Sequence, residues 1–295
     1  NKGLFANYNE CIFKSSGDLI KLYAQDDLWD RTILQSMIVP FQEKPDLAMV
    51  ACNRVWIDES DQEISMRQEF GETALLDGSE VIRRCLLKLI NWIGEPSNVM
   101  FPRRFAGAGF DSMYYHLGDM EYWFRILLNG QYQYLQEPLC KFRRHAASTT
   151  NKNLIGLLFA IDMLRLADAY ESLLKTWDLS AEDMKVRAAS TAGSYVNSLV
   201  RSGEISVQQL LNQKPSNDVQ AVRLLEEYKQ LAFYALLSGS RKEEAWTARL
   251  TAKELELVRV EQDLATVLNS KTWRSTSVLR KALGRAKRIP GRARS

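Results

Sequence analysis

The stretch Leu19-Ile20-Lys21-Leu22-Tyr23-Ala24-Gln25-Asp26-Asp27 decides how the first half of this 295-residue chain is interpreted. The apolar run up to Ala24 predicts a buried strand, and the two acids close it. Two like charges about 4 Å apart repel by roughly 4 kcal/mol near a protein surface, so adjacent acids at a strand end need water or a cation. We predict that Asp26 and Asp27 hold a divalent metal ion. The alternative is a strand followed by an N-capping acid, because Asp is a favoured cap and helix-like sequence follows.

The two acids are expected to have separate roles. Neighbouring side chains on a strand point to opposite faces, so both can serve one ion equally only if the chain bends between them. We expect Asp27 on the metal. We expect Asp26 on a sugar or ribose, or supporting the metal from outside its ligand shell.

Length and composition limit the class of protein. With 46% hydrophobic residues, the chain is long enough for two folded units. Its uncharged apolar runs are far shorter than the roughly 20 residues of a membrane span, and the first residues lack a signal-peptide core, so we expect a cytoplasmic protein. The four cysteines are widely spaced and only two histidines occur, which argues against a zinc site and favours reduced, packed thiols.

Alternating patterns predict an α/β layer fold for residues 1–150. Apolar spacing and Gly or Pro breaks define the expected elements. We expect helices at 4–16, 80–93 and 120–129, strands at 19–24, 47–57, 97–101, 132–135 and 139–142, and a polar excursion at 58–72.

The pattern becomes helical after Thr150, with helices expected at 154–177, 181–200 and 219–237. We divide this part into a helical domain at 151–240, a long helix or short coiled coil at 241–270 and a basic tail at 271–295. Leu250, Leu257 and Leu264 fall seven residues apart, as in a coiled coil. Residues 241–268 therefore form either a homodimer contact or a single amphipathic helix packed on its own domain.

A second set of motifs strengthens the interpretation of the acid pair. Gly94-Glu95-Pro96-Ser97 precedes a short strand, Gly109-Phe110-Asp111 follows it, and Gly118-Asp119 opens a helix. With Asp26-Asp27 ahead of them and Phe142-Arg143-Arg144-His145 behind, residues 1–150 resemble a family 2 glycosyltransferase of the GT-A fold, a Rossmann-like mixed sheet. The resemblance implies that this is the C-terminal part of that domain. We expect the nucleotide-binding first strands upstream, so the chain alone would be a poor enzyme.

The resemblance also implies a reaction. It is an inverting, non-processive transfer from a nucleotide-diphosphate sugar to a glycan or lipid-linked acceptor, assisted by Mg²⁺ or Mn²⁺. Asp26 and Asp27 would hold the metal on the diphosphate, and Asp119 would be the catalytic base, with Gly118 where the family commonly has Glu. Such a displacement needs one carboxylate to take the acceptor's proton while a cation absorbs charge on the leaving diphosphate. The alternative for Asp119 is an N-cap of the helix from Met120.

Further site residues follow from the same resemblance. His145 would join the metal or the diphosphate, and Arg143 or Arg144 would neutralise phosphate, because a guanidinium suits its oxygen geometry. A solvated arginine pair is the alternative. The acceptor pocket would be lined by Gly109, Phe110, Asp111 and His116. An ordinary loop histidine is the alternative for His116.

The tail differs in charge from the rest of the chain. From Lys271 onward there are nine basic residues and no acidic ones, whereas residues 1–270 carry 30 basic and 36 acidic groups. The segment 270–280 resembles the ends of some bacterial family 2 transferases that act on surface polysaccharides. Trp273 among cations suits an anionic membrane, which would place the protein at the inner face of the plasma membrane; a solvated tail is the alternative. Specific nucleic-acid binding is not supported, because the body is acidic and lacks a reader motif.

A function of another class stays open. The helical half could be an assembly or membrane-docking module attached to an incomplete, inactive transferase domain. Asp119 and the upstream sequence separate the two hypotheses, because only a working transferase needs a base and a complete donor site.

Overall fold

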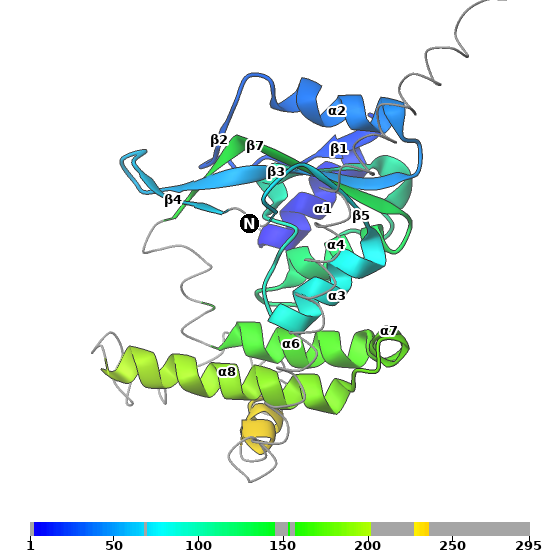
Figure 1. The fold of residues 1–295 in the computed structure, drawn as a ribbon. Helices are drawn as coiled ribbons and strands as arrows, with labels where there is room; N and C mark the ends of the chain where they lie inside the picture. Colours follow the sequence, from blue (N-terminus) through cyan, green and yellow to red (C-terminus); the bar gives the residue numbers. More distant parts are fainter. Residues whose placement is uncertain (1–2, 68–69, 145–152, 154–156, 202–226, 236–295) are drawn as a thin grey trace, which may run out of the picture. The chain divides into compact units, whose positions relative to one another are not determined.

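A computed structural model describes residues 3–67, 70–144, 153, 157–201 and 227–235. Within them a mixed sheet is followed by a group of helices, which confirms the expected α/β class with a helical C-terminal region (Figure 1). The first part contains α1 (Leu4–Lys14), β1 (Leu19–Lys21), β2 (Leu28–Trp29), α2 (Ile33–Glu43), β3 (Leu47–Ile57), β4 (Glu63–Arg67), β5 (Ala74–Asp77), α3 (Gly78–Lys88), η1 (Pro96–Asn98), β6 (Val99–Pro102), η2 (Arg103–Phe105), α4 (Gly118–Leu127) and β7 (Gln131–Arg143). The second contains α6 (Leu158–Ala169), α7 (Glu171–Thr176), α8 (Ala181–Arg201) and a helix at 227–235.

The centre of the sheet is β3, which is buried along nearly its whole length, as expected for a strand covered on both faces. The strand order is β1-β6-β3-β7-β2, with β4 on β3 and β5 on β7. Among the described pairs, β3 and β7 run parallel and the others antiparallel. β2 pairs with β7 so that Leu28 lies opposite Lys141. This register brings the end of β7 beside Asp27, the residue before β2.

Helices cover the two faces of the sheet (Figure 1). On one face, Ile33 and Met37 of α2 pack in a core that includes Val50 of β3 and Leu139 of β7. On the other face lie α1, α3 and α4, in a core that includes the fully buried Trp123. β3 supplies side chains to both cores, which explains its continuous apolar run.

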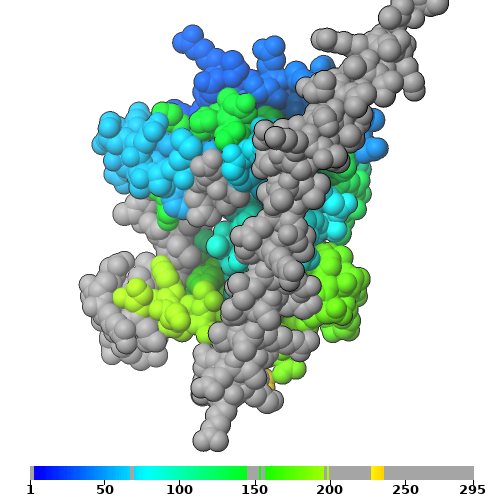
Figure 2. Space-filling model, in the orientation of Figure 1, coloured from blue at the N-terminus to red at the C-terminus, as the bar shows by residue number. Residues whose placement is uncertain are grey.

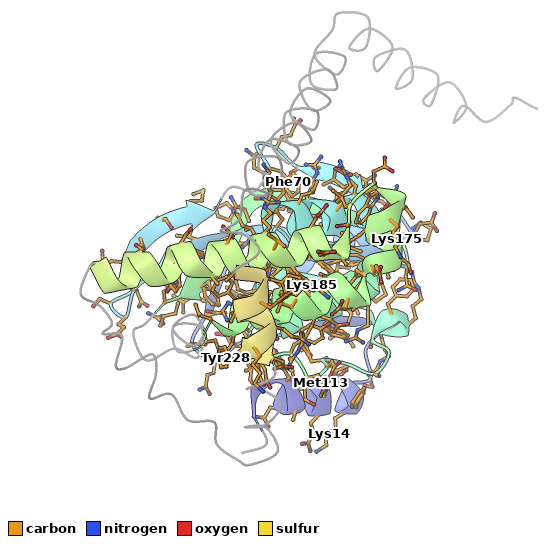
Figure 3. All side chains as sticks on the ribbon, turned by 90° about the horizontal axis from the view of Figure 1, so that it is seen from below. Lys14, Phe70, Met113, Lys175, Lys185 and Tyr228 are labelled. Atoms are coloured by element: carbon orange, nitrogen blue, oxygen red, sulfur yellow. The ribbon has the colours of Figure 1, made fainter. Side chains whose placement is uncertain are left out.

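The helices after residue 157 extend the second of these cores. Buried side chains of α6 and α8, among them Leu164 and Ala188, belong to the same apolar cluster as those of α4. Figure 3 shows the helix at 227–235 crossing α8 near Lys185, whose ammonium lies 5.6 Å from the ring centroid of Tyr234. The helical region therefore packs directly on the α/β part of the chain.

Several expected elements have different ends in the structure. The strand at 47–57 is confirmed as predicted, and the helices at 4–16 and 181–200 are confirmed within two residues. The two strands expected at 132–135 and 139–142 are one strand, β7, and the helix expected at 154–177 is divided into α6 and α7. The polar excursion at 58–72 contains β4, and α4 begins at Gly118 rather than at Met120. Of the helix expected at 219–237, residues 227–235 are described; the coiled-coil segment 241–268 and the tail 271–295 lie outside the described residues.

The predicted packing of the thiols is confirmed for three of the four cysteines and is wrong for Cys11. All four thiols are free; Cys52, Cys85 and Cys140 are buried, whereas Cys11 is exposed. In the part of the chain that the structure describes, no helix is both long and apolar enough to cross a membrane.

Gly78 marks the closest approach of α3 to the end of α4. A β-carbon at this position would overlap the carbonyl oxygen of Leu127 and lie 2.5 Å from that of Gly130. Because both neighbours are backbone atoms, Gly78→Ala should lower the free energy of unfolding by about 1–3 kcal/mol. Gly193→Ala in α8, where a β-carbon meets open space, is the matched control and should raise it by about 1 kcal/mol. Urea unfolding measures the free energy of unfolding of both variants. An unchanged value for Gly78→Ala would contradict this close contact.

Candidate functional site

The turn after β1 places the two predicted acids differently. Asp27 is 1% exposed, whereas the Asp26 side chain is exposed. Asp27 donates its N–H to the carbonyl oxygen of Ala24 at 3.1 Å, and its own carbonyl oxygen accepts from the Tyr23 hydroxyl at 2.8 Å. Gln25 and Asp26 form the turn itself. The chain therefore bends between the acids, which is the condition under which both can reach one ion.

The Asp27 carboxylate is only partly satisfied. Its Oδ1 accepts from the Arg143 N–H at 3.0 Å, while its Oδ2 is buried without a hydrogen bond of normal geometry to any described residue. Burial raises the pKa of Asp27 to about 6, although the nearby Ser97 hydroxyl favours the charged form. Leaving a buried acceptor unpaired is costly. Asp27 Oδ2 is thus an oxygen that a cation or a proton would stabilise.

Ser97 of η1 supports the acid turn from a neighbouring segment. Its hydroxyl oxygen accepts from the Ala24 N–H at 3.0 Å. Its carbonyl oxygen accepts from Trp29 Nε1 at 2.9 Å and also from the Lys21 ammonium. Since Ser97 is 1% exposed and contacts residues on both sides of the turn, it fixes where Asp27 lies.

The structure distinguishes the two arginines that were predicted to meet phosphate. The Arg143 guanidinium donates to the carbonyl oxygens of Asp26 at 2.9 Å and Asp58 at 2.7 Å, and to the Asp61 carboxylate at 2.5 Å. It ties the acid turn to the β3–β4 hairpin, which stands out at one side of the space-filling view (Figure 2). The Arg144 guanidinium lies 4.4 Å from the ring centroid of Trp56 and has no acidic partner among the described residues. Arg144 is the freer of the two to meet an anion.

Asp119 lies in the first turn of α4, and the N-cap position belongs to Leu117. Asp119 Oδ1 accepts from the Met120 N–H at 2.7 Å, and Oδ2 accepts from Asn91 Nδ2 at 3.3 Å. Asn91 is itself fixed, because its Oδ1 accepts from the N–H groups of Ile93 and Gly94 at 3.0 and 2.9 Å. The Asn91 amide group therefore donates to Asp119 and, at 3.2 Å, to the Gly94 carbonyl oxygen. Because the N-cap is Leu117, the N-capping alternative for Asp119 is wrong.

Burial and a neighbouring acid set the charge of Asp119. The pKa of Asp119 is raised to about 7, first by burial and also by the charge of Glu95, while the Met120 N–H and Arg54 act in the opposite direction. Glu95 also raises the pKa of Asp27. Arg54, which is 2% exposed, forms an ion pair with Glu95. No role for Glu95 was predicted from the sequence, yet its charge raises the pKa of both candidate acids.

Tyr8 of α1 is influenced by the charges of all three candidate acids. The pKa of its hydroxyl is raised to about 12, first by burial and then by the charges of Asp27, Asp26 and Asp119. Electrostatic effects between partly solvated groups fade beyond about 10 Å. Acids from two distant parts of the sequence therefore act electrostatically on the same hydroxyl. No sequence signal marks Tyr8, whose ring stacks 5.4 Å from that of Phe110 like a core aromatic.

Two of the residues predicted for the acceptor pocket have structural roles. Phe110 is 3% exposed, and its ring stacks on those of Phe5 and Tyr8, so its side chain lies in the core. Gly109 has a φ of +76°, and a β-carbon there would overlap the Asn9 amide. Glycine is favoured at Gly109 for both reasons.

The other two residues differ in accessibility. Asp111 is exposed, and its Oδ1 accepts from the Met113 N–H at 2.8 Å. His116 is partly buried, which lowers its pKa to about 4 and keeps its imidazole neutral near pH 7. Contact of this loop with an acceptor stays a prediction, with Asp111 as its accessible carboxylate.

The described residues alone do not form a complete metal site. His145 lies outside the described residues, and among those described no three His, Cys, Asp or Glu side chains group closely enough to hold a metal ion. Mg²⁺ usually keeps several waters and binds through one or two carboxylates together with substrate phosphates. Asp26 and Asp27 fit this binding mode, in which a diphosphate supplies the remaining oxygens.

Comparison with known proteins gives remote similarities. No known family model matches the chain. It is 33% identical over 160 residues to an uncharacterized protein, MT1568, of Mycobacterium tuberculosis, a match that covers 50% of this chain and 48% of that protein. The chain thus spans about half the length of this curated relative.

Among solved structures, the chain resembles S. aureus TarS. The crystal structure of TarS 1–349 has a TM-score of 0.46 at 12% identity and covers 69% of this chain and 55% of that one. The same TarS segment in complex with UDP-GlcNAc has a TM-score of 0.42 at 11% identity, covering 66% of this chain and 62% of that one. At these values the similarity is too distant to assign a function, so the function is argued from the residues of the site.

Proposed function

We propose that this chain is part of a family 2, GT-A glycosyltransferase that moves a sugar, with inversion, from a nucleotide-diphosphate sugar to a glycan or lipid-linked acceptor. The observation that carries the proposal is that the charges of Asp26, Asp27 and Asp119, which come from distant parts of the sequence, all act on the Tyr8 hydroxyl. Asp27 has a buried, unpaired oxygen, and Asp119 is a carboxylate with a pKa near 7. These are the two groups that an inverting displacement from a diphosphate needs.

Asp119 serves as general base in the proposed mechanism. A pKa of about 7 leaves a large fraction deprotonated near neutral pH and still basic enough to accept a proton. The Met120 N–H and Asn91 Nδ2 each hold one of its oxygens, so the carboxylate is oriented. As the acceptor oxygen attacks the anomeric carbon from the face opposite the diphosphate, its proton passes to Asp119. The bond between the anomeric carbon and the diphosphate oxygen breaks, and that oxygen takes the electron pair.

The acid turn binds the leaving group in this proposal. Asp27 offers the buried Oδ2, and the exposed Asp26 carboxylate lies at the same turn. A Mg²⁺ or Mn²⁺ ion held there together with the diphosphate would stabilise the charge that develops on the leaving oxygen. We assign the phosphate contact to Arg144, because the Arg143 guanidinium already holds Asp26, Asp58 and Asp61.

Donor turnover tests the function directly. Protein expressed from its complete reading frame is incubated with UDP-, GDP- and dTDP-sugars and with Mg²⁺, Mn²⁺ or EDTA, and release of nucleoside diphosphate is followed. We expect metal-dependent release with at least one donor, reduced in Asp27→Asn and in Asp119→Asn but unchanged in Asp46→Asn, an exposed acid on the α2–β3 loop. Absence of binding and release for every donor with either metal, or release unchanged in both site variants, would contradict the proposal.

A further inference from the structure

Asp162 of α6 holds the segment of chain that leads into α4. It is fully buried, and its Oδ2 accepts hydrogen bonds from three successive backbone N–H groups. The donors are Tyr115 at 2.8 Å, His116 at 2.6 Å and Leu117 at 2.8 Å. One carboxylate oxygen therefore fixes three consecutive residues that belong to a different part of the chain.

This arrangement answers two physical requirements at once. A buried carboxylate is costly unless its oxygens are hydrogen-bonded, and burial raises the pKa of Asp162 while the N–H groups of Leu117 and His116 oppose that effect. The N–H of Leu117, the N-cap residue of α4, needs an acceptor, because no side chain caps this end of the helix. Asp162 supplies that acceptor from the helical region, and its charge adds to those of Asp119 and Glu121 in the first turn.

The other oxygen of Asp162 and its neighbours are fixed as well. Asp162 Oδ1 pairs with Arg165 Nη1 at 3.2 Å, and Arg165 also forms an ion pair with Glu227 of the helix at 227–235. The Arg165 guanidinium stacks 4.5 Å from the ring centroid of Tyr115. Asn153 Nδ2 donates to the Tyr115 carbonyl oxygen at 2.8 Å. The segment is thus held through both its N–H groups and a carbonyl oxygen.

We propose that Asp162 is a positioning residue for Asp119, so that helix α6 forms part of the candidate site. Asp119 follows Leu117 by two residues, and its main-chain position is set by the segment that Asp162 fixes. This proposal rests on the proposed function, in which Asp119 is the general base. It assigns the helical region a role in the reaction itself, in addition to any role in assembly or docking.

The test compares Asp162→Ala and the milder Asp162→Asn with Asp168→Asn, in the protein expressed from its complete reading frame. Asp168 lies on the same helix, but its carboxylate is exposed and pairs with Lys185 of α8, away from the segment that leads into α4. Three quantities are measured: hydrogen exchange of the 115–117 amides, the titration of Asp119 by carboxyl NMR, and kcat and KM for donor and acceptor.

We expect at least tenfold faster exchange of these amides in Asp162→Ala, with the pKa of Asp119 moving toward its ordinary value as water reaches it. We also expect kcat to fall at least tenfold while the donor KM stays within twofold, because the acid turn is untouched. Asp162→Asn keeps one acceptor oxygen and should show smaller changes in the same directions. Asp168→Asn should match the native protein.

Unchanged amide exchange, or faster exchange with an unchanged Asp119 titration, would overturn the proposal. If Asp162→Ala does not fold, the same outcomes in Asp162→Asn decide. A native protein without transfer activity would refute the proposed function alone, since exchange and titration need no substrate.

Discussion

Asp119→Asn should lower kcat for sugar transfer by about 10²–10⁴, the usual contribution of a positioned general base. Donor affinity in the presence of metal should stay within about twofold, because the Asp27 turn and its contacts with Ser97 and Arg143 are untouched. The native rate should rise with pH and reach half its maximum near pH 7, where Asp119 loses its proton. Steady-state kinetics from pH 5.5 to 9, with donor binding by calorimetry, measure all three quantities.

The matched control for this variant is Asp46→Asn, an equal loss of charge at an exposed position. It should transfer sugar at the native rate with the native pH profile. Transfer by Asp119→Asn at the native rate would show that another group takes the proton. Glu95, whose charge influences Asp119, would be the next candidate.

The Asp119 substitution should also change how stability depends on pH. Because the folded-state pKa is raised above its unfolded value, the folded protein binds the extra proton, and native stability falls as pH rises from about 4 to 7. In Asp119→Asn this part of the slope is absent. The rise in the pKa of Asp119 from its ordinary value to about 7 corresponds to about 4 kcal/mol, so the difference over this pH range should be about 2–4 kcal/mol. The stability that Asp119→Asn gains at high pH is partly offset, because Asn91 Nδ2 then faces the amide nitrogen of the new side chain. Urea unfolding at pH 4.5 and 7.5 measures how the free energy of unfolding of each protein changes with pH. Equal changes in the native protein and in Asp119→Asn would contradict the raised pKa.

Local sequence patterns predicted the elements whose environment is uniform. β3 is covered on both faces, so its sequence is apolar except at Asn53 and Arg54 and its bounds are readable from composition. The helix-like sequence after Asp27 was noted without bounds, and it forms α2, in which Ile33 and Met37 have helical spacing. Pro40 inside this helix removes a hydrogen-bond donor and conceals the pattern. β7 was divided in two because Gln136, Glu137 and Pro138 interrupt its apolar run while the backbone continues.

The candidate site was predictable only where a residue type is informative by itself. Adjacent acids at a strand end and an acid at a helix start are informative, so Asp26, Asp27 and Asp119 could be named. Tyr8 and Asp162 could not, because an aromatic on an amphipathic helix and an acid in an apolar helix have many ordinary explanations. Their roles arise from contacts between distant segments, such as the three N–H groups on Asp162, that no local pattern encodes.

Asp27→Asn should abolish the metal dependence of donor binding and lower kcat/KM by on the order of 10²–10³, because a metal contributes several kcal/mol to charge stabilisation. The fold should tolerate the change: the amide oxygen can still accept from the Arg143 N–H, and the amide nitrogen replaces the unpaired Oδ2. Since the pKa of Asp27 is raised to about 6, native stability falls as pH rises from about 4 to 6. The variant should therefore be more stable than the native protein above pH 6, by up to about 3 kcal/mol.

Asp26→Asn separates the metal role from a general loss of charge at this turn. Asp26 is exposed and Asp27 is buried, so Asp26→Asn should raise the donor KM while leaving the requirement for Mg²⁺ or Mn²⁺ in place. Protons compete with the metal for Asp27, so native donor affinity should also weaken as the pH falls below about 6, and this dependence should be absent in Asp27→Asn. Calorimetric titration of donor with and without metal at pH 5.5 and 7.5 measures both effects. Loss of metal dependence in Asp26→Asn but not in Asp27→Asn would place the ion on the exposed acid, and the buried carboxylate would then be structural.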